Sequence, residues 1–394
     1  MALRGLKVVE MAGLAPAPFC GMMLADHGAS VVRVDRPRAM DVDRLAKGKR
    51  SLSVDLSKEA GVRIVRKLCS TADVLIDPFR IGVMEKLGLG PKVLIEDNKS
   101  LVYARLSGFG HYPTDGLTRK AGHDINFLAT SGILSRLGAA GSPPVAPVNL
   151  LADFGGGGLM CGFGIMAALY RRALDPEKRG QVVDCSMTEG VAYMASWLYT
   201  SSGMEAIWSG PKGTNLLDGG YAFYSCYETK DKKYIAVGAL EPQFFDRLAT
   251  ALNLSEEMRS EHQLDPDEQP RLKQLLAETF RRKTRQEWEE EFSRLNLDAC
   301  VSPVLEMDEV SKHPLAVARK SFFEDDGETN EYGVRPWPAP RLENYPAVPS
   351  SQSPIVGQHS VEILREIGYG QSEIQEFSDG EIIYDSGESF SSKL

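Results

Sequence analysis

A histidine and an aspartate thirty residues apart are the side chains best suited to acid–base chemistry in this chain. His123 stands between a glycine and an acid in Ala-Gly-His-Asp-Ile-Asn-Phe, residues 121–127, and is one of only six histidines among 394 residues. Asp153 precedes the glycine run Gly155–Gly158 by two residues. Each side chain can transfer a proton near neutral pH when its surroundings adjust its pKa. A single histidine is also often a structural residue, so the pattern leaves both roles open.

The glycines after Asp153 suggest a second component of such a site. We predict that they begin a helix, with free N–H groups and the positive end of the helix dipole facing a developing oxyanion. Close packing of helices explains the same glycines, and the two explanations are compatible. The longest uncharged run, Phe154–Tyr170, is shorter than the roughly 20 residues of a membrane span, so we expect a buried helix and no membrane span.

Charge is distributed unevenly along the chain. The net charge is −9, which argues against general nucleic-acid binding. Residues 1–60 hold ten Lys/Arg and seven Asp/Glu, whereas residues 321–394 hold four and fourteen. This favours the N-terminal part as host for an anionic ligand, although ordinary variation in surface charge explains it equally well.

A short basic segment superficially matches a phosphate-binding loop, Gly48-Lys49-Arg50-Ser51. Asp43 occupies the place of the leading glycine, and Arg50 replaces the magnesium-binding Ser/Thr, so the motif is not a P-loop. The cations nearby could still hold phosphates by charge and by arginine forks, or they could form a solvated basic face. They are Arg36, Arg38, Lys47, Lys49 and Arg50.

The N-terminal third alternates strands and helices. A strand at 6–11, a helix at 18–27 and a strand at 30–35 outline half of a dinucleotide-binding fold. The turn between the first two, residues 13–21, has prolines where G-x-G-x-x-G requires glycine, so we predict no nicotinamide or flavin cofactor. Further strands are predicted at 73–76, 101–106 and 181–187, and helices at 59–69, 82–86 and 189–200.

The pattern changes from about residue 215. A hairpin at 221–229 and 234–238 is followed by helices at 242–252, 271–281 and 284–295 and a strand at 299–305. We interpret this region as a compact α+β insert. A proline-rich passage, 336–354, then leads to a short helix at 360–367.

The cysteines and the two chain ends indicate the cellular compartment in which the protein is expected. The six cysteines contain no Cys-x-x-Cys pair, which favours free thiols over a zinc site or a disulfide framework. The N-terminus enters a strand pattern without a secretory signal. Ser392-Lys393-Leu394 is a peroxisomal address, read by the import receptor, when it is exposed at a C-terminus. We therefore expect a peroxisomal protein, and the sequence does not exclude a second, mitochondrial location.

Three long ungapped motifs resemble the family III CoA-transferase superfamily, and within it the racemases that act on 2-methylacyl-CoA. They are Ala121–Phe127, Leu150–Gly158 and Gly238–Phe244, and the resemblance runs from Met1 almost to the C-terminus. It implies an α/β fold: a large Rossmann-like, CoA-binding domain built from residues 1–205 and 335–394, and a small α+β domain at 215–330. Two such chains are expected to interlock as a homodimer that shares its sites.

The resemblance also implies roles for single residues. His123 is the base for the (S) epimer, Asp153 the base for the (R) epimer, and Glu241 orients His123. Asp124 is alternatively a helix cap or a support for another residue. Coenzyme A is part of the substrate, so we expect no separate cofactor and no metal. The expected substrate- and CoA-binding residues are Arg36, Val54, Asp55, Leu56, Ser57, Arg80, Gly122, Asp124, Ile125, Asn126 and Phe127.

The implied activity is isomerisation of (R)- and (S)-2-methylacyl-CoA thioesters through an enolate. The resemblance does not rank branched-chain fatty acyl-CoA against bile-acid intermediates. A CoA-transferase that uses Asp153 as nucleophile is the main alternative, and its mechanism does not need His123. A non-catalytic acyl-CoA carrier is a third possibility, which the joint presence of His123, Asp153 and Glu241 disfavours.

Overall fold

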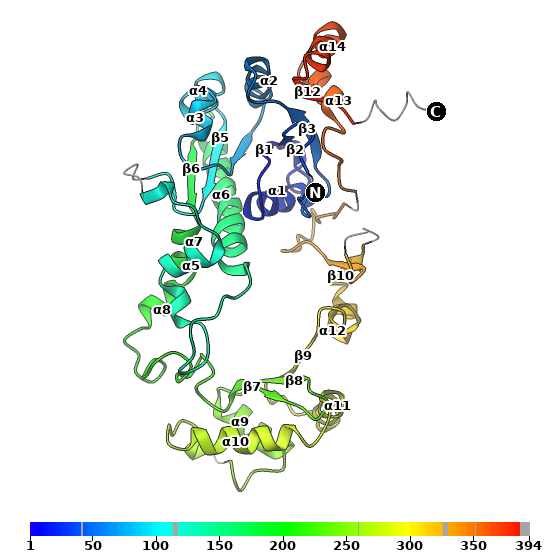
Figure 1. The fold of residues 1–394 in the computed structure, drawn as a ribbon. Helices are drawn as coiled ribbons and strands as arrows, with labels where there is room; N and C mark the ends of the chain where they lie inside the picture. Colours follow the sequence, from blue (N-terminus) through cyan, green and yellow to red (C-terminus); the bar gives the residue numbers. More distant parts are fainter. Residues whose placement is uncertain (41, 113–116, 259, 326–329, 351, 387–394) are drawn as a thin grey trace. The chain divides into compact units, whose positions relative to one another are not determined.

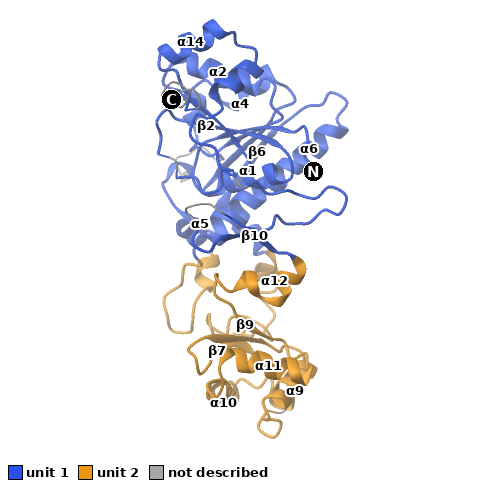
Figure 2. Ribbon diagram, turned by 90° about the vertical axis from the view of Figure 1, so that its right-hand side faces the viewer, with its two compact units in different colours: residues 1–131, 148–195, 320–394 blue, residues 132–147, 196–319 orange. Residues whose placement is uncertain are grey.

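The computed structural model describes residues 1–40, 42–112, 117–258, 260–325, 330–350 and 352–386. The chain divides into two compact units, shown in two colours in Figure 2. Unit 1 comprises residues 1–131, 148–195 and 320–394, and unit 2 comprises 132–147 and 196–319. The domain ranges expected from the sequence stay a prediction, and residues 132–147 cluster with unit 2.

Unit 1 is built on a seven-stranded sheet in the order β12-β3-β2-β1-β4-β5-β6. All neighbouring pairs are parallel except β12 with β3. The order of β1 to β6 is that of a dinucleotide-binding sheet, and it reverses direction between β1 and β4. The strands are β1 Lys7–Met11, β2 Ser30–Asp35, β3 Arg50–Val54, β4 Val74–Asp77, β5 Val102–Ser107, β6 Val182–Ser186 and β12 Ile383–Tyr384.

Helices cover both faces of this sheet (Figure 1). Alternate strand residues, such as Val9, Val34 and Leu52, pack into a core with helices α2, α3, α4, α13 and α14. The other face packs against α1 and α6. The bounds are α1 Pro16–Asp26, α2 Glu59–Cys69, α3 Val83–Lys86, α4 Pro91–Asp97, α5 Asp124–Thr130, α6 Met160–Leu174, α7 Met187–Met194, α13 Ser360–Glu366 and α14 Gln371–Asp379. Unit 1 also holds the 3-10 turn Leu117–Arg119 and the hairpin of β10 Phe322–Glu324 with β11 Val334–Pro336.

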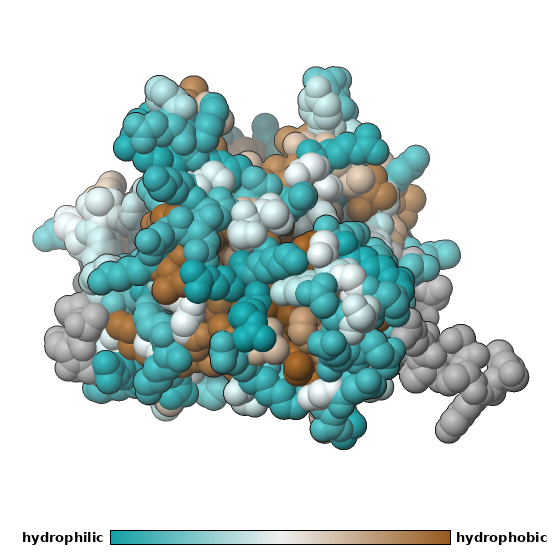
Figure 3. All heavy atoms as spheres, turned by 90° about the horizontal axis from the view of Figure 1, so that it is seen from above, coloured by the Kyte–Doolittle hydropathy of each residue, from teal (hydrophilic) through white to brown (hydrophobic). Residues whose placement is uncertain are grey.

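Local sequence explains where α2 forms. Glu59 occupies its first turn and Arg66 and Lys67 its last, which complements the helix dipole. Its buried side chains, such as Ile64 and Leu68, recur at helical spacing. From the side that carries α2 and α14 in Figure 1, the surface is mostly hydrophilic with small apolar patches (Figure 3).

A π-helix, Leu150–Leu159, runs directly into α6. The combined stretch 150–174 is long and apolar enough to cross a membrane, by length and composition alone. These two properties are weak evidence for a span, because core helices of α/β domains share them. Here α6 packs against β5 and β6.

Unit 2 contains a three-stranded antiparallel sheet, β7-β8-β9, with its own apolar core. Thr284 and Glu287 form a reciprocal capping box at the start of α11. The elements are α8 Ser196–Thr200, β7 Tyr224–Glu228, β8 Tyr234–Gly238, α9 Pro242–Ala251, α10 Gln269–Phe280, α11 Arg285–Leu295, β9 Val301–Val304, α12 Pro314–Arg319 and the 3-10 turns Ile133–Arg136, Ser260–His262 and Val310–Lys312.

Several predicted elements have the observed bounds, whereas one is wrong and others were not predicted. The strand at 30–35, the helix at 59–69 and the strand at 234–238 have the predicted bounds. The predicted helix 189–200 is wrong as one element, because α7 ends at Met194 and α8 starts at Ser196. Strand β3 and the pair α14 and β12 were not predicted. β3 and α14 are rich in polar residues, and β12 is only two residues long. The pairing of β12 with β3 joins segments that lie far apart in the chain.

Candidate active site

A cavity of about 1360 Å³ opens at the carboxyl ends of β1, β2, β3 and β4. Residues that end or follow these strands line it, among them Met11, Asp35, Val54 and Pro78. The strand order reverses between β1 and β4, and open α/β sheets bind ligands outside the carboxyl ends of strands at such a point. We call this cavity the strand-end pocket.

Among the described residues, five cations and four acids line the strand-end pocket, the acids being Asp35, Asp55, Glu381 and Asp385. Its lining includes Arg36, Arg38, Lys58, Arg80 and Lys86. Some of this charge is balanced by the chain's C-terminal part: Arg38 lies 3.4 Å from Glu381, and Lys58 Nζ donates to the carbonyls of Gly380 at 2.8 Å and Glu381 at 3.0 Å. Arg36 and Arg80 are exposed. The pocket can therefore hold an anionic group by charge and by guanidinium hydrogen bonds.

Six of the eleven expected binding residues line this pocket: Arg36, Val54, Asp55, Leu56, Ser57 and Arg80. Asp55 Oδ1 accepts hydrogen bonds from the N–H and the hydroxyl of Ser57, which lower the pKa of Asp55 and shape the turn after β3. The expected residues Gly122, Asp124, Ile125, Asn126 and Phe127 do not line it. The binding roles of all eleven stay predictions.

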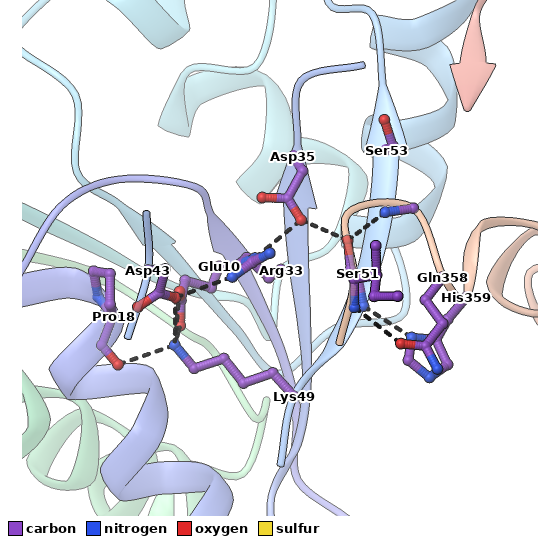
Figure 4. A network of polar contacts seen from close by, with 12 residues as sticks. Glu10, Pro18, Arg33, Asp35, Asp43, Lys49, Ser51, Ser53, Gln358 and His359 are labelled. Atoms are coloured by element: carbon purple, nitrogen blue, oxygen red, sulfur yellow. Dashed lines mark hydrogen bonds and ion pairs between the residues drawn. The ribbon is translucent and has the colours of Figure 1, made fainter. Parts of the chain in front are cut away.

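Most cations of the basic cluster at residues 36–50 form ion pairs with acidic residues of the protein itself. Lys49 is buried between the carboxylate of Glu10, at 2.8–2.9 Å, and the carbonyl of Pro18 at 3.0 Å (Figure 4). Burial raises the pKa of Glu10, against the opposing effect of Lys49. The suggestion that Lys49 holds a phosphate is therefore wrong, since a buried charge needs this partner.

Two further cations of that cluster also have partners. Lys47 pairs with Asp325, and Arg50 pairs with Glu362 at 2.9 Å and Glu366 at 2.6 Å. Only Arg36 and Arg38 of the five line the strand-end pocket. Arg33 connects β2 to the loop after it, because its guanidinium pairs with both Asp35 and Asp43 (Figure 4).

The two proposed bases stand on neighbouring helices of unit 1. His123 is the N-cap residue of α5 and is exposed. Asp153 lies in the π-helix, is partly buried, and accepts a hydrogen bond from Asn149 Nδ2 at 3.2 Å. Burial raises the pKa of Asp153, the Asn149 hydrogen bond opposes this, the charge of Asp124 adds to it, and His123 opposes it.

Residues after His123 hold this arrangement together. Asp124 is buried, and its Oδ2 accepts the N–H of Ala152 at 2.7 Å and of Asp153 at 2.9 Å. Asn126 Oδ1 accepts the N–H of His123 at 3.0 Å. Phe127 is buried and packs edge-on against Phe109, with ring centroids 5.0 Å apart. These three side chains are engaged within the protein itself.

The glycines do not begin a helix, so that prediction is wrong. The π-helix starts at Leu150, five residues earlier, and Gly155–Gly158 lie inside it. Close packing explains them: a Cβ at Gly156 would lie 2.6 Å from the nitrogen of Val191 in α7, and one at Gly158 would lie 2.7 Å from the carbonyl of Pro16 in α1. The N–H groups of the first helical turn lack acceptors within the helix, and here Asp124 accepts those of Ala152 and Asp153.

Glu241 lies in unit 2, where it is the N-cap residue of α9. Its expected contact with His123 stays a prediction.

Ser392-Lys393-Leu394 lies outside the described residues, as does part of the loop 111–120. All six cysteines are free thiols. Across the described ranges, no group of three or more His, Cys, Asp or Glu could hold a metal ion.

Sequence reasoning missed two parts of the site. Asn149 is four residues before Asp153, and this spacing on a helix would have indicated the contact. The C-terminal wall of the strand-end pocket, which includes Ser378, Glu381 and Tyr384, gave no signal, because only the pairing of β12 with β3 brings it there.

Known proteins resemble this chain in sequence and in fold. An alpha-methylacyl-CoA racemase of Mus musculus is 50% identical over 97% of this chain and 98% of its own, and that of Homo sapiens is 49% identical with the same coverage. A CaiB/BaiF family protein from Brucella suis has a crystal structure with a TM-score of 0.78, 25% identity, and coverage of 93% of this chain and 99% of its own. Residues 3–360 match the model of CoA-transferase family III. The chain therefore belongs to CoA-transferase family III.

Proposed function

We propose that this protein is a racemase that interconverts (R)- and (S)-2-methylacyl-CoA thioesters. The observation that carries the proposal is the placement of His123 and Asp153 at adjacent helix starts, joined through Asp124. The same unit holds a cationic pocket suited to the phosphates of coenzyme A. Relatives about half identical over nearly the whole chain are named as alpha-methylacyl-CoA racemases, which supports the same activity here.

The chemistry follows from the acidity of the carbon next to the thioester. One base removes its proton from one face, an enolate forms, and the conjugate acid of the other base returns a proton to the opposite face. His123 serves the (S) epimer and Asp153 the (R) epimer, and Glu241 orients His123. Burial raises the pKa of Asp153 above its ordinary value, which is the direction that suits a group that must both take and give a proton.

We propose that the reaction uses no cofactor besides the coenzyme A of the substrate. In dinucleotide-binding sheets an acid at the end of the second strand binds a ribose. Here that acid, Asp35, is buried and is bonded by Arg33 at 2.9 Å and by the Ser51 hydroxyl. Arg36 and Arg38 beside it suit phosphate instead.

Proton NMR in deuterated water tests the activity. Purified protein with (R)-2-methylacyl-CoA should replace the alpha proton by deuterium and produce the other epimer. Complete absence of exchange would contradict the proposal.

Two further experiments test the alternatives. An added carboxylate should receive no coenzyme A, and trapping of a modified Asp153 by hydroxylamine during turnover would favour a transferase instead. Activity lost with a chelator and restored by a metal would contradict the metal-free mechanism.

We further propose that two copies form a homodimer. One stripe of α6 and its start is apolar and exposed: Leu159, Phe163, Met166, Tyr170 and Leu174 recur three to four residues apart and are 40–70% exposed. Such a stripe is large for a free surface. A second copy, as the family resemblance implies, is the occupant that we propose. Light scattering measures the mass in solution, and a monomer of 43.2 kDa at micromolar concentration would contradict this.

We also propose a cellular location for the protein and two classes of acyl group for its substrate. Ser392-Lys393-Leu394, where it forms the exposed C-terminus, directs the protein to peroxisomes. Branched-chain fatty acyl-CoA and bile-acid intermediates are the two substrate classes to compare, by kcat/KM. Deletion of the three residues should leave the protein outside peroxisomes with unchanged activity; continued import would place the address elsewhere.

A further inference from the structure

The carboxylate of Asp124 joins the two segments that carry the proposed bases. Its Oδ2 accepts the main-chain N–H groups of Ala152, at 2.7 Å, and Asp153, at 2.9 Å. Asp124 directly follows His123 and is only 4% exposed. One oxygen atom therefore connects the main chain next to one base with the main chain of the other.

This contact satisfies a requirement of the π-helix. A helix leaves the N–H groups of its first turn without intrahelical acceptors, and an anionic side chain there is favourable. Asp124 supplies that acceptor from a different helix, α5, so the start of the π-helix is fixed relative to α5. Displacement of a catalytic group by about 1 Å can cost roughly 100-fold in rate.

We propose that Asp124 is a positioning residue that fixes Asp153 relative to His123, and that it acts through this contact rather than by binding coenzyme A. The inference rests on the proposed racemase function and adds the element that holds the two bases in register. It replaces the binding role expected for the Asp124 side chain.

The charge of Asp124 gives a second, separable effect. After burial, it is the other influence that raises the pKa of Asp153, whereas the Asn149 hydrogen bond and the charge of His123 lower it. Phe19 from α1 and Val191 and Met194 from α7 present apolar side chains to the π-helix. From β6, the Cys185 thiol lies 3.8 Å from the carbonyl of Gly156 and 3.6 Å from that of Gly157. Loss of the Asp124 charge should therefore lower the pKa of Asp153.

Two substitutions separate position from charge. In Asp124→Asn the amide oxygen can accept both N–H groups, so position is kept and charge is lost. In Asp124→Ala both are lost. We expect Asp124→Ala to lower kcat for exchange of the (R) epimer by about 10- to 100-fold with KM little changed. Asp124→Asn should recover most of kcat, with the pH profile limb of Asp153 moved to lower pH.

Amide hydrogen exchange provides a readout independent of activity. The peptide that contains residues 150–155 should lose protection in Asp124→Ala and keep it in Asp124→Asn. The matched control is Thr284→Ala, which removes a helix cap in unit 2 (Thr284 Oγ1 accepts the N–H of Glu287 at 3.2 Å) and should leave kcat and the pH profile unchanged.

Three outcomes would overturn the inference. A rise of KM with unchanged kcat would make Asp124 a binding residue. Equal loss of kcat in both variants, with the pH limb unmoved, would give its carboxylate a direct chemical role. Unchanged protection of 150–155 in Asp124→Ala would remove the contact as its basis. Inactivity of the unsubstituted protein would instead contradict the proposed function and leave the protection measurement as the test.

Discussion

The strand-end pocket and the pair of bases are held in place by different kinds of structure. The pocket lies at the ends of four parallel strands, whose hydrogen-bonded register places Met11, Val34 and Asp35 with little freedom. In the same unit, buried ion pairs such as Lys49 with Glu10 tie the loop after β2 to the sheet. The bases stand at the starts of two helices, and the side chain that joins these is Asp124.

This difference separates binding from chemistry. At the carboxyl ends of the strands, the loss of one side chain should leave the other pocket residues in place, because backbone hydrogen bonds between the strands hold them. Two helix starts joined by one carboxylate have less redundancy. We therefore expect substitutions at the pocket to change KM and those at the bases to change kcat, and the following experiments sharpen or break that division.

The largest effect should come from Asp153→Asn. The amide keeps the shape of the carboxylate and cannot act as a base, so racemisation should fall by about 10²–10⁴-fold while KM stays near its original value. His123 can still take the (S) proton and return a deuteron to the same face. Proton NMR of each epimer in deuterated water measures this exchange with retention.

His123→Ala is the mirror experiment, in which the (R) epimer alone should exchange. The comparison is between epimers within one variant, because residual exchange is slow in both. Equal exchange of both epimers in Asp153→Asn would mean that one base reaches both faces.

Lys49→Met tests the buried ion pair with Glu10 that ties the loop after β2 to the sheet. It leaves the carboxylate of Glu10 buried without its cation, which should lower the free energy of unfolding by about 3–5 kcal/mol. Urea denaturation measures this, and KM should rise because the loop that carries Arg36 loses an anchor. Glu10→Met together with Lys49→Met should be less destabilising than Lys49→Met alone; the opposite order would show that the pair itself is not the support.

Arg36→Ala should act on binding only. A hydrogen bond to a charged group contributes about 1.5–3 kcal/mol, so KM should rise roughly 10- to 150-fold with kcat unchanged. Steady-state kinetics measure both. Arg50→Ala is the matched control, because Arg50 belongs to the same basic cluster yet pairs with Glu362 and Glu366. Equal effects of the two substitutions would contradict the assignment of the pocket.

The smallest effect concerns pH and Asp77, at the end of β4. Burial raises the pKa of Asp77 to about 6 from the ordinary value of 3.8, against hydrogen bonds from the N–H of Phe79 and the hydroxyl of Tyr103. The folded state therefore binds more protons between about pH 4 and 6, and the free energy of unfolding falls as pH rises through this range.

Asp77→Asn should remove that fall, which is at most about 3 kcal/mol. The amide oxygen can still accept from Phe79, and Tyr103 can donate to the carbonyl of Leu89, 3.1 Å away. Urea denaturation at pH 4.5 and pH 7 compares the two proteins. An equal pH dependence in both would mean that other groups cause it.

Sequence patterns predicted most of unit 1 because they act locally. The apolar run of β2 and the spaced apolar residues of α2 depend on neighbours in the chain, and both elements have the predicted bounds. The motif around His123 predicted the family, which the match over residues 3–360 confirms. Arg36 and Val54–Ser57 were expected to act together, and they line one pocket.

These local sequence patterns could not predict contacts between distant segments of the chain. Lys49 and Arg36 belong to one basic stretch of sequence, yet one is buried against Glu10 and the other lines the pocket. The glycines after Asp153 predicted a helix start, but the helix begins five residues earlier. Asp124 from another helix accepts N–H groups in its first turn, a contact that no local pattern indicates. Residue type and spacing alone thus determined the chemistry that this chain can perform. Tertiary structure decided which of several equivalent cations, carboxylates and N–H groups take part, because burial and pairing depend on segments far apart in the chain.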